Sequence, residues 1–269
     1  MLGHFPRSVT NPPILIETEH FVVKLAENHE EVERAQRLRY EIFNVEQGRG
    51  LEISEKFGID FDEFDEYCLH LLVMRKGDDR VIGTYRAHLG TIANSFKGFY
   101  SSREYYIKGF YKIADKCVEL GRTCVSPDHR TGAVVSLLWS AIVELLARAN
   151  AIYMLGCVSL EETEPKLGWA LYEYLCEKKC VSQDFSVTPR PGFVLKRPSE
   201  QEVLKILSDT KSLIKHIPPI FKGYLRLGGL ICGDPALDRE FGTIDFFILV
   251  DITKVPERYQ KRFNYKNNP

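Results

Sequence analysis

The chain has 269 residues, of which 44% are hydrophobic and 27% are charged, as in a globular protein that can bury a full-sized core. Its 36 lysines and arginines nearly balance its 37 aspartates and glutamates, which argues against a dedicated nucleic-acid-binding protein. Seven cysteines without a C-x-x-C pair are typical of a reducing compartment, and no apolar run reaches the ~20 residues of a membrane span. We therefore expect a cytoplasmic protein, with peripheral contact to the inner membrane face as a further expectation.

The first predicted elements are a short strand over residues 21–25 and a helix that begins after Asn28. A glutamate three residues beyond Asn28 gives the spacing of a capping box. Apolar residues then recur every three or four positions and predict a buried helical stripe. They are Val32, Ala35, Leu38, Ile42 and Val45. Arg39, Phe43 and Glu46 form a second stripe, whose charges are either binding groups or partly solvated helix residues.

Residues 48–67 form an acidic segment in which Asp62 and Asp65 are three positions apart. A solvated loop is the usual meaning of such a cluster. Aromatic residues interleave with the acids, which suggests the alternative of a lid that packs on a ligand. These aromatic residues are Phe57, Phe61, Phe64 and Tyr67.

Residues 68–89 are predicted to form a buried strand and its hairpin partner. Arg86 lies on the second strand, and a buried arginine needs a carboxylate partner, for which Asp62 and Asp65 are the candidates. Two histidines of the hairpin lack the spacing of metal ligands, so we interpret them as core residues and expect no metal site. They are His70 and His88.

The stretch from Lys116 to Leu146 predicts a strand, a break and a long apolar helix. In a regular strand Glu119 and Arg122 would point to opposite faces, because their separation is odd. Gly121 between them favours a bulge that turns the following amides toward a ligand. The start of the helix offers unpaired N–H groups and the positive end of a dipole, where a phosphate can bind.

The remaining segments continue the alternation of strands and helices, which favours a mixed, largely covered α/β sheet. Residues 96–114 are expected to form either an amphipathic helix or a surface for a lipid chain or an acidic partner. The other predicted strands cover residues 151–160, 184–191 and 245–252, and the other predicted helices begin at Pro165, at Ser199 (as one helix to Pro218) and at Ile220. Dinucleotide, Walker A, nucleophile-elbow and zinc-protease motifs do not occur in the chain.

The order of these elements resembles the GNAT N-acyltransferase superfamily, whose pyrophosphate loop corresponds here to residues 129–134 with Gly132 in the middle. Four motifs resemble, more specifically, the ornithine lipid-forming N-acyltransferases, often labelled hemolysin-like, and the related acyl-homoserine-lactone synthases. The motifs are Arg39-x-x-x-Phe43-x-x-Glu46, Asp62-x-x-Asp65, IGTYR ending at Arg86, and ELGRTCV from Glu119. The resemblance covers most of residues 20–253.

This resemblance implies a GNAT-like mixed and strongly twisted sheet with a bulged central strand, helices on both faces, and extra C-terminal helices and a strand. Within a single domain it implies an N-terminal arm over residues 1–19, an acyltransferase core over 20–191 and a C-terminal extension over 192–269. The implied enzyme moves a (3-hydroxy)fatty acyl group from acyl carrier protein to the amine of an amino acid, ornithine above all. It has no permanently bound cofactor, and its donor is the phosphopantetheine thioester of the carrier or, alternatively, acyl-coenzyme A.

The attacking amine must be neutral, so a carboxylate serves as its base only if the pKa of that carboxylate is raised toward neutrality. Glu119 is the candidate base, Arg122 lies beside it, and the N–H groups of Cys124 and Val125 are the candidates for polarising the thioester carbonyl. The substrate-binding candidates are Arg39, Phe43, Asp62, Asp65 and Arg86, for which purely structural ion pairs are an equal interpretation. The phosphate-binding candidates are His129, Arg130, Thr131, Gly132 and Ala133. Three basic residues are candidates for docking the acidic carrier, namely Arg148, Lys178 and Lys179.

Three alternatives stay open. The first is an enzyme similar to acyl-homoserine-lactone synthases or to short-chain acyl-coenzyme A acyltransferases. The second is a covalent acyl-enzyme on Cys124 or Cys157, which the apolar setting of both residues disfavours. The third is a module without enzymatic activity that binds lipid or membrane.

Overall fold

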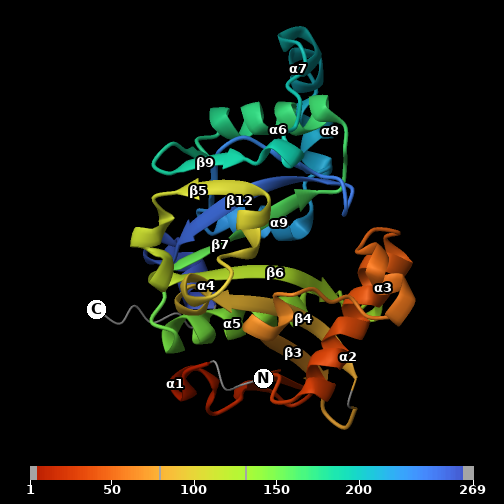
Figure 1. Ribbon diagram of the computed structural model, residues 1–269, viewed down its shortest axis with the longest axis vertical. Coiled ribbons are helices and arrows are strands. Elements are labelled where there is room, and N and C mark those ends of the chain that lie inside the picture. Colours follow the sequence, from red (N-terminus) through yellow and green to blue (C-terminus); the bar gives the residue numbers. More distant parts are fainter. Residues whose placement is uncertain (1–4, 79, 131, 263–269) are drawn as a thin grey trace. The chain divides into compact units, whose positions relative to one another are not determined.

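The structure is a computed structural model that describes residues 5–78, 80–130 and 132–262. The chain divides into two compact units (Figure 1). Of the described residues, unit 1 contains those within 5–98, 114–152 and 257–262, and unit 2 contains residues 99–113 and 153–256. The predicted boundaries after residues 19 and 191 do not coincide with these units and stay a prediction.

Unit 1 contains an antiparallel sheet in the order β1-β2-β3-β4-β6. Its strands are β1 (Ile14–Glu17), β2 (Phe21–Leu25), β3 (Leu69–Arg75), β4 (Val81–Leu89) and β6 (Cys117–Val125). The predicted hairpin is confirmed as β3 and β4. All nine residues of β4 are buried, as expected for a strand that is covered on both faces.

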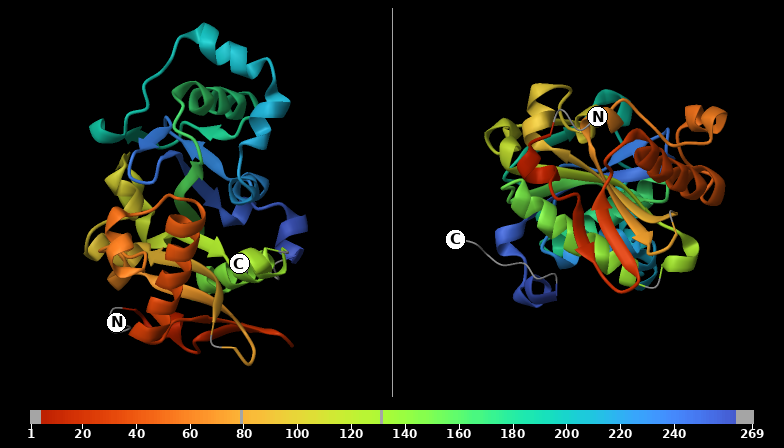
Figure 2. Two further views of the ribbon diagram at one scale, coloured as in Figure 1. Left: turned by 90° about the vertical axis from the view of Figure 1, so that its right-hand side faces the viewer. Right: turned by 90° about the horizontal axis from the view of Figure 1, so that it is seen from below.

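Two helices cover opposite faces of this sheet, α2 (His29–Tyr40) and α5 (Ala133–Arg148) (Figure 2). A Cβ at Gly83 would lie 2.8 Å from Val134 Cγ1, so the missing side chain lets α5 approach β4 closely. The other helices of unit 1 are α1 (Arg7–Thr10), α3 (Glu52–Phe57), α4 (Gly90–Ser95) and α10 (Glu257–Arg262). Asn28 caps α2 as predicted, and its Oδ1 accepts a hydrogen bond from the Glu31 N–H at 3.0 Å.

Helix α2 does not continue in α geometry to Val45. Residues Glu41–Glu46 form a π-helical turn, in which each N–H bonds one residue further back than in an α-helix. The wider turn shifts the following side chains around the axis. The prediction that Val45 belongs to the buried stripe is therefore wrong, and this side chain is 67% exposed.

Unit 2 contains a mixed sheet in the order β7-β12-β10-β8, in which β10 and β8 are parallel. Its strands are β7 (Tyr153–Leu160), β8 (Val181–Ser182), β10 (Leu230–Cys232), β11 (Ala236–Asp238) and β12 (Thr243–Asp251), and β5 (Tyr105–Lys108) pairs separately with β9 (Ser186–Pro189). Its helices are α6 (Pro165–Glu177), α7 (Glu200–Leu207), α8 (Thr210–Lys215) and α9 (Pro219–Arg226). The predicted mixed α/β class is confirmed.

Two predictions for unit 2 were wrong. Of the two alternatives for residues 96–114, the helix is the wrong one: the segment contains a 3₁₀ turn followed by β5, because Tyr105 and Phe110 are buried against Phe247. The single helix after Ser199 is two helices, because Asp209 begins a new one by accepting a hydrogen bond from the Ser212 N–H at 3.0 Å. In the part of the chain that the structure describes, no helix combines the length and the hydropathy that crossing a bilayer requires.

Candidate active site

A β-bulge interrupts the pairing of β4 with β6. Thr84 lies opposite Cys124 and Arg86 lies opposite Gly121, so two steps along β4 match three steps along β6. The bulge lies where the sequence predicts it, but the left-handed residue is Arg122, with φ 51°, rather than Gly121. A non-glycine residue in this region costs on the order of 1–2 kcal/mol, so its contacts must hold it there.

The extra residue brings Arg122 to the same face as Glu119. Arg86 and Arg122 both contact Asp62, which places their side chains on one side of the sheet. Glu119 lies opposite His88, two residues from Arg86 and therefore on that same face. In a regular strand, Glu119 and Arg122 would lie on opposite faces because their spacing is odd. The bulge adds one residue and places them on the same face.

Arg39 is the centre of a buried ion-pair network on this face. Its Nε donates to Asp60 Oδ2 at 2.7 Å, and its Nη2 donates to both carboxylate oxygens of Asp65 at 3.0 Å. The side chain of Arg39 is fully buried, so its charge depends on these carboxylates. The interpretation as a partly solvated helix charge is therefore wrong for Arg39.

Two further arginines complete the network. Arg86 Nη1 donates to Asp62 Oδ1 at 2.7 Å and to Asp65 Oδ1 at 3.3 Å. Arg122 Nη2 donates to Asp62 Oδ2 at 3.3 Å, and its Nη1 lies 3.8 Å from Asp60 Oδ1. Three arginines thus balance three aspartates and fix the acidic segment against β4 and β6.

The network sets the protonation of the groups inside it. Burial alone would raise the pKa of Asp65, but the charges of Arg39 and Arg86 outweigh it and hold the pKa well below its usual range. The pKa of Asp62 is lowered in the same way, because Arg86 and Arg122 outweigh its burial. Burial lowers the pKa of His70 to about 4, so the ring is neutral and its Nε2–H donates to the Asp65 carbonyl oxygen at 3.1 Å.

Glu119 lies beside the network and is 5% exposed. Its Oε2 lies 3.8 Å from His88 Nδ1, and the Phe64 ring packs edge-on against His88 with ring centroids 6.0 Å apart. The sequence singled out His88 only as a core histidine and did not single out Asp60. The sequence contains a pattern that could have identified each of them. His88 follows Arg86 by two residues and so shares its strand face, and Asp60 begins the acidic run that contains Asp62.

Phe43 and Glu46, which complete the motif of Arg39, do not join the network. Phe43 packs against the apolar cluster between α2 and the sheet. Glu46 instead forms a two-pronged ion pair with Arg130, at 2.6 and 2.8 Å, which lowers the pKa of Glu46 chiefly through the hydrogen bonds to the arginine. Arg130 Nε also donates to the Val125 carbonyl oxygen at 3.0 Å, so Arg130 ties the π-helical turn to the end of β6.

The predicted phosphate loop leads into α5. His129 ends a 3₁₀ turn and is half-buried, Thr131 lies outside the described residues, and Gly132 precedes α5 with φ 83°, where glycine is favoured. Within the described residues, the first turn of α5 carries no acidic side chain and no side-chain cap. The first N–H groups of α5, beginning with that of Ala133, therefore have no intrahelical partner and can meet an anion.

Cys124 and Val125 lie at the end of β6 and are both buried. Burial raises the pKa of the Cys124 thiol well above its usual range, so the thiol stays protonated at neutral pH. Since the thiolate is the nucleophile, this environment argues against an acyl-enzyme on Cys124.

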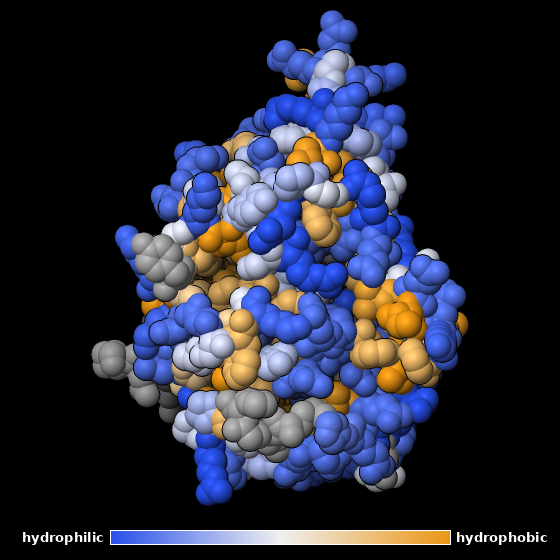
Figure 3. Space-filling view, in the orientation of Figure 1, coloured by the Kyte–Doolittle hydropathy of each residue, from blue (hydrophilic) through white to orange (hydrophobic). Residues whose placement is uncertain are grey.

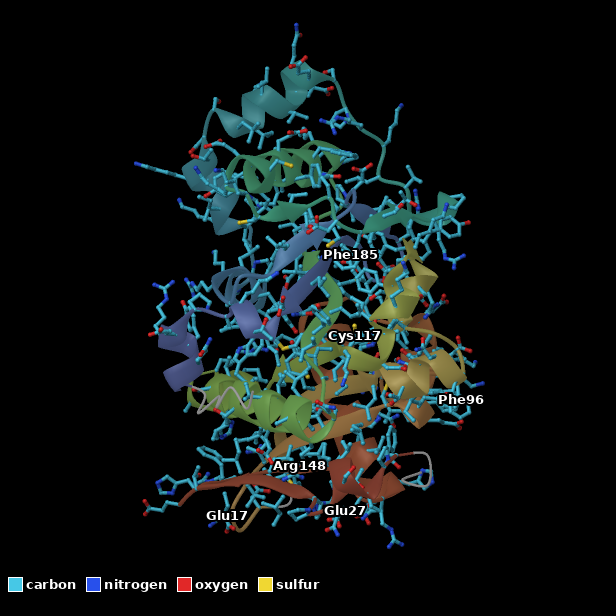
Figure 4. All side chains as sticks on the ribbon, turned by 90° about the vertical axis from the view of Figure 1, so that its left-hand side faces the viewer. Glu17, Glu27, Phe96, Cys117, Arg148 and Phe185 are labelled. Atoms are coloured by element: carbon cyan, nitrogen blue, oxygen red, sulfur yellow. The ribbon has the colours of Figure 1, made fainter. Side chains whose placement is uncertain are left out.

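The structure places Arg148, one of the docking candidates, away from the phosphate loop, and a docking role stays a prediction. Arg148 lies at the far end of α5, about 22 Å along the helix axis from its first residue. Its guanidinium is paired with Glu144 at 2.7 Å and donates to the Pro12 carbonyl oxygen at 2.6 Å, beside the N-terminal strand (Figure 4). Lys178 and Lys179 belong to unit 2 and stay a prediction.

Comparison with known proteins matches residues 38–140 to an acetyltransferase (GNAT) domain, a range that holds every candidate residue named above except Cys157 and the docking candidates Arg148, Lys178 and Lys179. The chain is 31% identical to the L-ornithine N(alpha)-acyltransferase of Brucella abortus over 91% of this chain and 89% of that protein. It is 29% identical to the protein of the same name from Agrobacterium fabrum, over 88% of this chain and 82% of that protein. Among solved structures, the CoA-dependent acyl-homoserine lactone synthase BjaI is 19% identical over 88% of this chain and 83% of its own, with a TM-score of 0.47.

Proposed function

Because this chain belongs to the L-ornithine N(alpha)-acyltransferase family and carries a GNAT domain, it is an acyltransferase, and we propose that it acylates the α-amine of ornithine from an acyl thioester. The observation that carries the mechanism is the β6 bulge, which sets Glu119 and Arg122 on one face beside the buried network. The proposed product is an N-acyl amino acid of the lyso-ornithine-lipid type.

In the proposed reaction, the neutral amine attacks the carbonyl carbon of the thioester and forms a C–N bond. Glu119 accepts the proton that the nitrogen loses, directly or through one water molecule. The C–S bond then breaks, and the leaving thiolate of the donor takes up this proton from Glu119, directly or through the same water molecule. His88, at 3.8 Å from Glu119, is in place to orient this carboxylate during the transfer.

The oxygen of the tetrahedral intermediate needs hydrogen-bond donors, and the N–H groups of Cys124 and Val125 after the bulge are the proposed ones. In enzymes where one such donor has been removed, the activation barrier rises by about 3 kcal/mol. Arg39, Asp62, Asp65 and Arg86 hold the acidic segment over the acceptor. Their proposed role is therefore to shape the acceptor pocket rather than to move protons.

The first turn of α5, together with Arg130 and Gly132, is the proposed phosphate site for the donor. We propose acyl carrier protein as the donor, since a single phosphodiester suits this short loop, with acyl-coenzyme A as the second candidate. A patch of exposed apolar side chains over α3, visible in Figure 3, supports contact with the fatty chain or with a membrane surface. It consists of Val45, Ile53 and Phe57.

The test is an acylation assay with ornithine, followed by mass spectrometry of the amide product. It uses a 3-hydroxyacyl chain on carrier protein and on coenzyme A in parallel, and a panel of other amino acids as acceptors. Glu119→Gln is expected to lower kcat by about 10²–10⁴-fold with an unchanged circular dichroism spectrum, because the amide cannot accept the proton. The matched control is Glu63→Gln, an exposed carboxylate paired with Lys97, which should keep the wild-type rate.

Wild-type turnover in Glu119→Gln would remove this residue as the base. Product from coenzyme A but not from carrier protein would favour the second donor. Amide formation with every amine except ornithine would contradict the proposed acceptor, and liposome binding without any amide product would favour a module that only binds lipid.

A further inference from the structure

Unit 2 buries a second group of acidic side chains, made of residues that the proposed reaction does not use. Glu104 follows the 3₁₀ turn Tyr100–Arg103, Cys157 lies on β7, and Asp245 lies on β12. One potential ligand atom from each of the three lies within 4.8 Å of the other two. Glu104 is 2% exposed and Asp245 is 5% exposed, so both carboxyl groups are out of contact with bulk water.

The pairing of β7 with β12 creates this convergence. Phe247 lies opposite Cys157 and Asp245 lies opposite Ser159, so Cys157 and Asp245 are diagonal neighbours on one face of the sheet. Tyr105 holds the third element in place, because its hydroxyl donates to the Asp245 carbonyl oxygen at 2.8 Å. Three segments that are far apart in sequence thus supply one ligand atom each.

Among the described residues, no ion pair supplies the positive charge that would balance this group. Among the ion pairs of the described residues, neither Glu104 nor Asp245 is joined to a lysine or arginine, and the neighbouring Arg103 instead faces Glu240 at 3.9 Å. Asp245 Oδ1 accepts a hydrogen bond from the Thr243 hydroxyl at 3.0 Å, and the Asp245 carboxyl group also hydrogen-bonds to Ser159 and to Glu104. Glu104 Oε2 is fully buried and accepts no hydrogen bond from the described residues.

Two buried carboxyl groups this close repel each other when both are ionised. Either a shared proton or a bound cation can relieve this repulsion, and the two differ in what they require of the third residue.

We propose that Glu104, Cys157 and Asp245 bind a divalent metal ion of the zinc class. A shared proton needs only the two carboxyl groups, whereas a thiolate beside two carboxylates is a donor set for a borderline-soft ion such as Zn²⁺. Small side-chain rotations suffice to bring atoms within 4.8 Å onto an ion whose bonds are about 2.0–2.3 Å long. Glu104 also lines a cavity of about 200 Å³, whose other charged lining residues are Asp238, Glu240, Arg103 and Arg239.

The ion joins β7, β12 and the segment before β5, so its role is to stabilise unit 2. Binding that favours the folded state raises the midpoint of thermal unfolding as the free metal concentration rises. This role is independent of the acyl transfer proposed for unit 1, and its failure leaves that reaction untouched.

The test uses the untagged full chain, stripped with a chelator and equilibrated with Zn²⁺, and measures bound zinc by plasma mass spectrometry after dialysis. One equivalent is expected, with a higher midpoint of thermal unfolding. Co²⁺ in place of Zn²⁺ should give the near-ultraviolet charge-transfer band of a cobalt thiolate. Cys157→Ser and Glu104→Gln, both close in size to the native residues, should weaken binding at least tenfold, and Cys157→Ser should abolish the band.

The matched control is Cys180→Ser, another half-buried cysteine of unit 2, which should bind like the wild type. Equal zinc affinity in the wild type, Cys157→Ser and Glu104→Gln would overturn the assignment. The absence of bound zinc and cobalt in the wild type would also overturn it. In that case, an unchanged midpoint of thermal unfolding in Glu104→Gln would show that the two carboxyl groups share a proton.

Discussion

The two units bury similar sets of acidic side chains but treat their charge in opposite ways. In unit 1, Asp60, Asp62 and Asp65 face three arginines at hydrogen-bond or ion-pair distance, and the pKa values of Asp62 and Asp65 fall. In unit 2, Glu104 and Asp245 have no arginine or lysine partner among the described ion pairs, and their pKa values rise.

The difference shows that burial alone does not decide whether a carboxyl group is ionised. The same loss of hydration raises the pKa in both units, and only the arginines of unit 1 reverse the shift. A permanent cation on the chain makes the acids of unit 1 a fixed structural element. The acids of unit 2 remain open to a proton or to an external cation.

The largest expected effect follows from removing the central cation of unit 1. Arg39→Met leaves Asp60 and Asp65 buried without this partner and should lower the free energy of unfolding by about 3–5 kcal/mol, as measured by urea denaturation. Arg37→Met breaks an exposed pair with Glu33 and should cost less than about 0.5 kcal/mol. Equal losses in the two variants would mean that the buried network contributes no more than a surface ion pair.

A second effect follows from pH. The pKa of His70 is lowered to about 4, whereas an unfolded histidine titrates near 6.5, so the unfolded chain binds more protons between these values. The stability that this residue contributes is complete above about pH 6.5 and is lost as the pH falls toward 4, on the order of 3 kcal/mol in all. Below about pH 4, protonation of Asp62 and Asp65, whose pKa values are lowered in the folded protein, removes more of the folding stability.

Urea unfolding across this pH range measures the loss. His70→Gln should flatten the dependence between pH 6.5 and 4 and leave the steeper loss below pH 4. A wild-type stability that stays constant down to pH 4 would show that His70 is protonated in the folded protein.

The smallest expected effect comes from neutralising one buried aspartate, and the resulting change in the free energy of unfolding has opposite signs in the two units. The pKa of Asp245 is about 6 in the folded protein and lower in the unfolded chain, so ionisation of this group disfavours folding. The loss of folding stability begins above the ordinary pKa of aspartate and is complete above about pH 6. In the presence of a chelator at pH 8, Asp245→Asn should therefore raise the free energy of unfolding by about 1–2 kcal/mol. The matched change in unit 1, Asp65→Asn, should lower it, and a loss in both variants would contradict the contrast between the units.

The sequence by itself determined the elements that depend on local chemistry. The Asn28 cap, the β3–β4 hairpin and the alternation that places Arg86 and His88 on one face follow from spacing, because periods of 2 and 3.6 residues fix which side chains share a face. The need of Arg86 for a carboxylate, and the acidic segment that supplies Asp62, also follow from the sequence, since a buried cation requires a partner.

Only the tertiary structure decided which residue takes the left-handed conformation and which acids meet which cations. Arg122 occupies that conformation although Gly121 precedes it, and from there its guanidinium forms an ion pair with Asp62. The pairing of Cys157 with Asp245 across β7 and β12, and the approach of Glu104, depend on segments more than fifty residues apart. Local propensity carries no information about such meetings, because they are set by the packing of whole strands.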